Sequence, residues 1–208
     1  MKVTVPCHCG NSFEYEYDET VEINPETADN IVHGRFMNTV CTNCGITLKP
    51  EFPVMFTYPP KQIQIFLIPE LQRDLFLRGK SLLNNKKPDR FVIGFQELAE
   101  KIRIFESGLD DDAIELAKYY ILSKIETETE TENEIIIYFD SLKNDRLSFQ
   151  IHGLKEKEVG MLNVDMPFYR MSQEKLEKSI NEEPFSKFLT PPYISLMRIY
   201  REYTENIE

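Results

Sequence analysis

The sequence predicts an α+β fold, in which a small N-terminal β module with a short inserted helix is followed by an α+β C-terminal region. Three observations predict it. The four cysteines of the chain lie in two short clusters near the N-terminus. Several short segments alternate apolar and polar residues, which is the period of half-buried strands. Between residues 95 and 125, apolar residues instead recur every three or four positions, as on one face of a helix.

Up to the second cysteine cluster, the N-terminal module is predicted to contain three strands and one helix. Residues 2–6 form a short strand that leads into the first cysteine cluster, and residues 13–17 alternate aromatic and acidic side chains like a second strand. The Asn-Pro pair at 24–25 is a helix start, because Asn caps a helix and Pro suits its first turn. Gly34 ends this helix, and residues 35–41 form a strand into the second cluster.

Residues 46–57 and 61–68 are predicted to form a hairpin whose turn is Tyr58-Pro59-Pro60. Asparagine, lysine and proline at 84–88 indicate a loop or linker. We therefore expect three parts in the chain. These are a zinc-ribbon-like module at 1–70, a connector at 71–90 and an α+β domain at 91–208.

The C-terminal region is predicted to alternate helices and strands. Phe95, Leu98, Ile102 and Phe105 share one face of a first helix, and Gly108 closes it. The second helix is apolar over most of its circumference, so we expect it to be well buried. The predicted core of this region consists of Phe95, Leu98, Ile102, Ile114, Ile121, Ile136 and Phe149. The predicted elements are helices at 95–106 and 109–125, an acidic connector at 126–134, strands at 135–140, 147–152 and about 161–165, and helices at 172–181 and 193–205.

The cysteine clusters have the spacing C-x-C and C-x-x-C, and 31 residues separate them. Four thiolates can fill the tetrahedral shell that a structural zinc ion prefers. Each cluster ends in glycine, which tolerates positive φ and lets its backbone N–H approach a metal-bound sulfur. The sequence therefore predicts one zinc ion in a two-knuckle zinc ribbon. Its predicted ligands are Cys7, Cys9, Cys41 and Cys44.

Other residues of metal-binding type have simpler interpretations. His8 lies inside a cluster, but four thiolates already complete the shell, so we expect it at an exposed knuckle tip. His33 lies near a helix C-terminus, where a cation is ordinary. The acidic run at 110–112 could suggest Mg²⁺, yet it is better explained as an N-cap and favourable charges at a helix start. We find no phosphate loop, nucleophile elbow or metalloprotease helix, and therefore predict no catalytic residue.

At the two clusters the sequence resembles the CpXC family of bacterial and archaeal proteins, which is named for a C-P-x-C pattern and has no characterised function. The strand at 13–17, the hairpin that ends at Ile68-Pro69-Glu70, and residues 95–116 are also similar to the family, so the resemblance spans roughly 1–125. It implies the four cysteines as ligands and no catalytic residue. His8 and Thr42 stand where the family has proline, which stiffens a knuckle without ligating metal.

The net negative charge of the chain disfavours nucleic acid as a binding partner. The formal net charge is −11; residues 1–70 carry −5 and the remainder −6, so both parts repel a phosphate backbone. We therefore expect no nucleic-acid binding. No stretch approaches the roughly 20 apolar residues of a membrane span, and no apolar signal region is evident, so we expect a cytoplasmic protein without membrane contact. Clustered thiols in that compartment are more often metal ligands than disulfides.

Three functions remain open from the sequence. The first is an interaction module, in which zinc holds the β module and the acidic remainder docks a protein partner. The second is a thiol redox switch, because the cysteine spacing is similar to that of redox-activated zinc chaperones, in which oxidation pairs the cysteines and ejects zinc. The third is an enzyme with a site in the C-terminal region, which the missing catalytic motifs argue against without excluding it.

Overall fold

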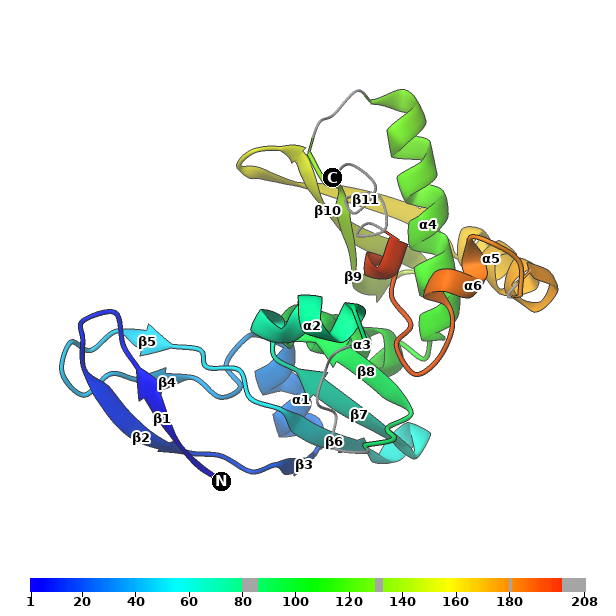
Figure 1. Cartoon of the computed structure of the whole chain (residues 1–208). Helices are drawn as coiled ribbons and strands as arrows, with labels where there is room; N and C mark the ends of the chain where they lie inside the picture. The colour runs from blue at the N-terminus through cyan, green and yellow to red at the C-terminus, as the bar shows by residue number, and fades with distance from the viewer. Residues whose placement is uncertain (80–85, 130–132, 180, 200–208) are drawn as a thin grey trace. The chain divides into compact units, whose positions relative to one another are not determined.

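The computed structural model describes residues 1–79, 86–129, 133–179 and 181–199, and its architecture is α+β as predicted (Figure 1). The chain divides into two compact units, Met1–Ala99 and Glu100–Glu208. The division falls inside helix α3, Gly94–Glu106, so this helix contributes residues to both units.

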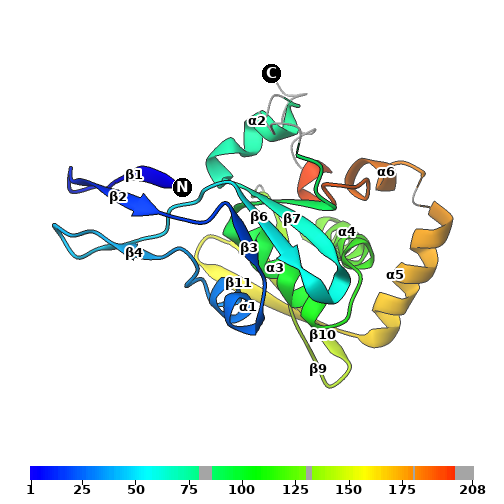
Figure 2. The same cartoon turned by 90° about the horizontal axis from the view of Figure 1, so that it is seen from below.

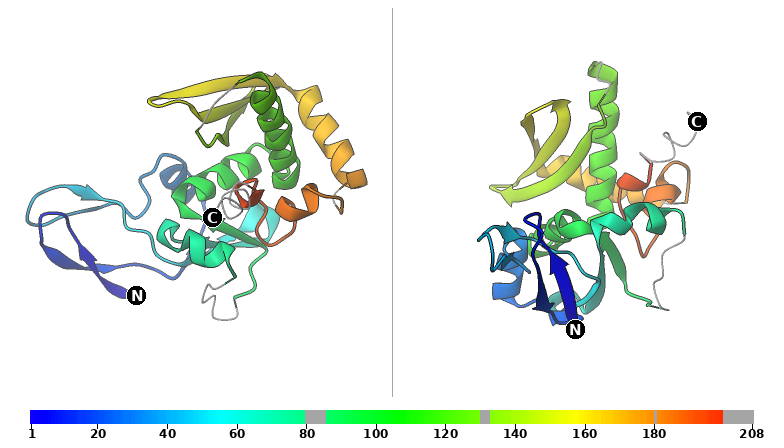
Figure 3. Two further views of the ribbon diagram at one scale, coloured as in Figure 1. Left: turned by 45° about the horizontal axis from the view of Figure 1, so that its top comes forward. Right: turned by 60° about the vertical axis from the view of Figure 1, so that its left-hand side comes forward.

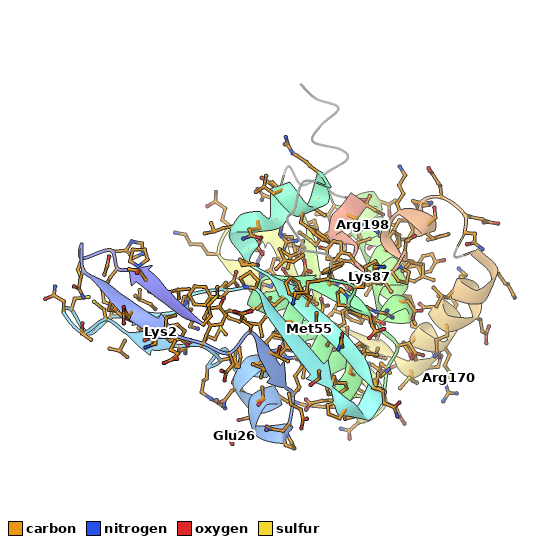
Figure 4. The ribbon with its side chains drawn as sticks, turned by 60° about the horizontal axis from the view of Figure 1, so that its bottom comes forward. Lys2, Glu26, Met55, Lys87, Arg170 and Arg198 are labelled. Carbon is orange, nitrogen blue, oxygen red and sulfur yellow. The ribbon has the colours of Figure 1, made fainter. Side chains whose placement is uncertain are left out.

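Two small antiparallel hairpins open the first unit. Strand β1, Lys2–Pro6, pairs with β2, Ser12–Glu16, and β4, Thr39–Val40, pairs with β5, Thr47–Leu48. Lys2, at the start of β1, is labelled in Figure 4. Each hairpin carries one cysteine cluster in its turn.

The predicted strand at 35–41 is wrong for its first half. The N–H groups of Arg35 and Phe36 both donate to the Asn30 carbonyl, and Met37 has φ +58°. These residues therefore form turns after the helix, because their N–H groups are already used by the helix end. Only Thr39 and Val40 remain free to pair.

The first unit also contains a four-stranded sheet of order β3-β6-β7-β8 (Figure 1), of which β3, β6 and β7 are labelled in Figure 2. Its strands are β3 (Thr20–Glu22), β6 (Val54–Tyr58), β7 (Ile63–Ile68) and β8 (Arg90–Ile93). The β6–β7 pair is the second part of the predicted hairpin, and it turns through the 3₁₀ helix η1, Pro59–Lys61. The predicted first strand, 46–57, is divided, because Thr47–Leu48 pairs with β4 and only Val54–Tyr58 pairs with β7. Strand β8 was not predicted; it pairs in parallel with β7. Met55 on β6, labelled in Figure 4, pairs with Thr20 and Phe66.

Helix α1, Pro25–Val32, follows β3 and confirms the predicted start signal. The side chain of Asn24 accepts a hydrogen bond from the Thr27 N–H at 2.8 Å, which satisfies one of the free donors of a helix N-terminus. Glu26, labelled in Figure 4, lies in the first turn. Gly34 follows the helix with φ +65°, as the prediction of its end requires.

The core of the first unit lies on the hairpin β6–β7. Val54, Phe56, Ile65 and Leu67 are fully buried. Burial of each such side chain contributes about 1.5–3 kcal/mol. Beyond β7 come the 3₁₀ helix η2, Glu70–Gln72, and the short helix α2, Arg73–Leu77. The guanidinium of Arg73 is buried and lies 2.8 Å from the Glu97 carboxylate of α3.

The second unit pairs a long helix with an antiparallel sheet of order β11-β10-β9 (Figure 3). Helix α4, Asp111–Glu128, contacts β9 and α5. The turn between β9 and β10 has positive φ at Asn144 and Asp145, as a two-residue hairpin requires. The remaining elements are β9 (Ile136–Lys143), β10 (Arg146–Lys155), β11 (Glu158–Asp165), α5 (Met166–Ser179) and α6 (Phe185–Phe188).

Several predicted boundaries in this unit need correction. Helix α4 continues into the acidic segment as far as Glu128, and α5 begins six residues before the predicted start. Residues 193–195 are not helical, whereas residues 197–199 are, so the predicted last helix begins later than residue 193. The rest of that prediction falls largely on 200–205, outside the described residues, as do Asn84, Asn85, residues 130–132 and residue 180.

A buried ionic network links the helices of the second unit. The Lys118 ammonium of α4 lies 3.1 Å from the Glu100 carboxylate and 2.8 Å from that of Glu115. Glu100 also accepts from the Phe139 N–H of β9, and Glu115 from the Leu196 N–H. The network therefore bonds α4 to α3, to β9 and to the segment that contains Leu196.

Candidate metal centre

The four cysteine sulfurs converge in the first unit, where they lie within 4.8 Å of one another. Cys7 Sγ is 3.6 Å from Cys44 Sγ, and Cys9 Sγ is 3.7 Å from Cys41 Sγ. A disulfide would bring two sulfurs to about 2.05 Å, so these residues are free thiols. Zinc–sulfur bonds of about 2.3 Å in a tetrahedron give sulfur–sulfur distances of about 3.8 Å. The group has the size that one tetrahedral metal ion needs.

Each cluster forms a tight turn that ends in glycine. Gly10 has φ +84° and Gly45 has φ +73°, and the N–H of each donates to the carbonyl of the first cysteine of its cluster. A Cβ at either glycine would meet no atom within 4 Å, so backbone conformation rather than space requires glycine here.

The N–H groups that approach the sulfurs belong to other residues than the predicted glycines. The N–H of Asn11 donates to Cys9, and that of Ile46 donates to Cys44. Glycine thus acts indirectly: its positive φ turns the next residue's N–H toward the second sulfur of each cluster. The first sulfurs accept from within the turn, Cys7 from Cys9, and Cys41 from Cys44 and Asn43.

Two asparagine side chains add hydrogen bonds between the clusters. Asn11 Nδ2 lies 3.7 Å from Cys41 Sγ, and Asn43 Nδ2 lies 3.6 Å from Cys9 Sγ. Each asparagine therefore reaches across to a sulfur of the other cluster. Sequence reasoning missed both residues, although an amide side chain in each turn was visible as a signal.

Hydrogen bonding divides the thiols into two kinds. Backbone N–H groups of Cys44 and Asn43 lower the pKa of Cys41 to about 6, and the Asn11 N–H and the Asn43 amide lower that of Cys9. For Cys7, the Cys9 N–H lowers the pKa, but burial and the neighbouring sulfurs raise it to about 12. The pKa of Cys44 is also raised, by burial and by Cys9 and Cys41, despite the Ile46 N–H.

Burial differs within each cluster. Cys7 and Cys41, which begin the clusters, are 7% and 1% exposed, whereas Cys9 and Cys44 are exposed. The cluster thus has one buried and one exposed cysteine from each hairpin.

Aromatic stacking holds the first hairpin against the chain that follows it, because the ring of Tyr17 lies 4.5 Å from that of Phe52.

The other candidate ligands do not join the cluster. His8 is exposed and lines a groove of about 480 Å³ beside β5, and His33 bonds Asp29 at the end of α1. The acids at 110–112 do not converge on one point. Asp111 is buried against Lys101, and Asp112 accepts from the Ala113 N–H. Among the His, Cys, Asp and Glu side chains of the described residues, the four cysteines lie close enough together to share a metal ion.

In the ranges that the structure describes, the helices lack the combined length and apolar character needed to cross a bilayer.

The fold and the cysteine cluster define a protein with a paired-knuckle, four-cysteine module. The CpXC family model, described as CpXC protein, matches residues 5–118, which is more than half of the chain. The chain belongs to this family. It is also similar to an uncharacterized protein of Treponema pallidum (strain Nichols), with 21% identity over 94% of this chain and 97% of the relative. No solved structure matches.

Proposed function

We propose that the chain is a zinc protein whose Cys7, Cys9, Cys41 and Cys44 hold one structural Zn²⁺ ion. One observation carries the proposal: two sulfur pairs at 3.6 and 3.7 Å, from hairpins far apart in sequence, in a group whose sulfurs all lie within 4.8 Å of one another. Those distances suit the edge of a tetrahedral zinc–thiolate centre. Four protein ligands leave no open position, which favours a structural over a catalytic ion.

The donor set supports zinc among the available metals. Four soft thiolates select zinc or iron–sulfur chemistry over magnesium and calcium, which prefer oxygen. The lowered pKa of Cys41 and Cys9 favours the thiolate that a metal requires, while Cys7 and Cys44 must release their protons when the ion binds. The ion would join the two hairpins, whose strands pair only within each hairpin.

We further propose that the chain is a protein-interaction module, and that the zinc-stabilised part takes part in docking beside the acidic remainder. Val40 and Ile46, next to the second cysteine cluster, are each more than half exposed, and neighbouring apolar side chains at a surface favour protein contacts. The net charge of −11 disfavours nucleic acid as the partner. We also propose that the protein acts in a bacterial cytoplasm, and that residues 1–70 form a module followed by a connector at 71–90 and a domain at 91–208.

A redox switch is the second candidate, because Cys9 and Cys44 are exposed within the same cluster. Oxidation that joined cysteines in pairs would remove thiolate ligands and release the metal. Mild peroxide treatment, with zinc release and far-ultraviolet circular dichroism measured during it, distinguishes a redox switch from a structural zinc site. A switch loses zinc and β structure at low oxidant, whereas a structural site keeps both.

The proposal is tested by elemental analysis of the purified chain and by capture of partners with the zinc-loaded protein. A Cys41→Ser variant is the control, because it removes a buried ligand. Partners that bind both forms equally would show that the zinc module does not do the docking.

A further inference from the structure

Asn11 and Asn43 act on the same pair of sulfurs. The backbone N–H of Asn11 donates to Cys9 and its side chain to Cys41; the backbone N–H of Asn43 donates to Cys41 and its side chain to Cys9. Each asparagine thus bonds one sulfur of its own hairpin and one of the other. The arrangement is reciprocal, so Cys9 and Cys41 each accept from both asparagines.

The second sulfur pair, Cys7 and Cys44, is held differently. Its N–H donors in the described structure come from the backbone, from Cys9 for Cys7 and from Ile46 for Cys44. A hydrogen bond to a thiolate withdraws part of its charge and lowers its nucleophilicity. Cys7 and Cys44 therefore keep more charge on sulfur than Cys9 and Cys41 do.

Two of the four cysteines are accessible to a reagent in solution. Cys7 and Cys41 are buried, so an electrophile in solution reaches Cys9 and Cys44. Both are exposed, yet Cys9 accepts from two asparagines and Cys44 from one backbone N–H. The difference in hydrogen bonding, not access, then decides which sulfur reacts first.

We propose that Asn11 and Asn43 are positioning residues that hold Cys9 and Cys41 as the lasting metal ligands, and that Cys44 is the ligand at which metal exchange and electrophilic attack begin. This rests on the proposed metal site. Cys44, which is exposed and bonded by one backbone N–H, would be the first thiolate to give up a bound metal ion, while Cys9 and Cys41 would still join the two hairpins through it.

The test is competitive alkylation of the full-length, zinc-loaded chain by limiting iodoacetamide. The attacking sulfur forms one C–S bond, the C–I bond breaks and iodide leaves, and peptide mass spectrometry reads the modified cysteine. In the wild type we expect Cys44 to react several-fold faster than Cys9. In Asn43→Ala the rate at Cys9 rises at least threefold, and in Asn43→Asp, which keeps the shape but adds a negative charge, it rises further.

The matched control is Asn38→Ala, because the Asn38 amide bonds the Gly34 carbonyl and no sulfur. Its alkylation order stays that of the wild type. Wild-type protein that reacts first at Cys9, or Asn43 variants with an unchanged rate at Cys9, would overturn the inference; the wild-type order needs no variant to fold. The zinc content of the same samples distinguishes failure of this inference from failure of the proposed zinc site. Wild-type protein without metal would overturn the proposed zinc site itself.

Discussion

The Cys9 sulfur lies 3.7 Å from the Cys41 sulfur, although 31 residues separate the two in sequence. Two sulfurs at this distance, on separate hairpins and without a disulfide, could hold one metal ion between them. Because the ion would join two hairpins that share no strand pairing, its binding energy is also folding energy.

Cys41→Ser, or strong chelation, should therefore unfold the N-terminal module. Structural zinc contributes on the order of 10 kcal/mol in small domains, more than a core of this size can replace. We expect residues 1–70 to become protease-sensitive while a fragment from about residue 90 to the C-terminus survives. Limited proteolysis, with the fragments identified by mass spectrometry, measures the protease sensitivity of each part.

The start of the surviving fragment locates the boundary. Strand β8 pairs with β7, and the contacts divide the chain after Ala99, so survival from about residue 100 would place the boundary inside α3. Digestion of the whole chain at a single rate would contradict two separately stable parts.

Glu97→Ala should destabilise the first unit strongly. The Glu97 carboxylate accepts from buried Arg73 at 2.8 Å and from the Ile93 N–H at 2.9 Å, so its loss takes a buried carboxylate away from a buried cation. Breaking such a pair costs about 3–5 kcal/mol. Chemical denaturation measures it, with exposed Glu106→Ala on the same helix as the control. A loss below about 1 kcal/mol would contradict a structural role for the pair.

Stability of the second unit should fall as pH rises from about 5 to about 7.5. Burial, and after it the charge of Glu115, raise the pKa of Glu100 to about 7 from an ordinary 4.5, although Lys118, the Phe139 N–H and Lys101 oppose the shift. The folded state then keeps a proton that the unfolded state has lost, so the free energy of unfolding drops by about 2 kcal/mol over this window.

Glu100→Gln isolates that effect. The amide has nearly the same shape, stays neutral and can still accept from the Phe139 N–H, so its stability should vary less with pH than the wild type's over the same range. Denaturant titrations at pH 5 and 7.5 compare the two proteins. Equal pH dependence in both would show that Glu100 does not titrate there.

Nucleic acid should not bind tightly. With a net charge of −11 spread over both parts of the chain, few counterions are released on contact with phosphates. Fluorescence anisotropy with labelled DNA and RNA at physiological salt should give no saturation below 1 μM, an estimate set by ordinary non-specific affinities. Submicromolar binding would contradict it.

Local signals predicted much of the fold. The helix start predicted at Asn24 and the positive φ predicted at Gly10 and Gly45 agree with the structure, whereas the N–H groups that approach the sulfurs are those of Asn11 and Ile46 and not of the glycines. The family resemblance is also confirmed by the family model. Of the predicted core residues, Leu98, Ile102, Ile114, Ile121 and Phe149 are buried.

The failures come from partners distant in sequence. Ile136 was predicted in the core, but the register of β9 buries Ile135 and Ile137 instead, and a shift of one residue reverses the face of a strand. Strand β8 exists because β7 offers it an edge. The buried Lys118 could not be predicted, because one of its carboxylate partners, Glu100, lies on a different helix.

The most direct test of the account is the metal content of the purified chain. Elemental analysis of protein expressed with zinc available should give one zinc per chain in the wild type, with stoichiometric loss in the Cys41→Ser variant. Wild-type protein with a zinc content near zero, or with iron in its place, would contradict a structural zinc site formed by Cys7, Cys9, Cys41 and Cys44.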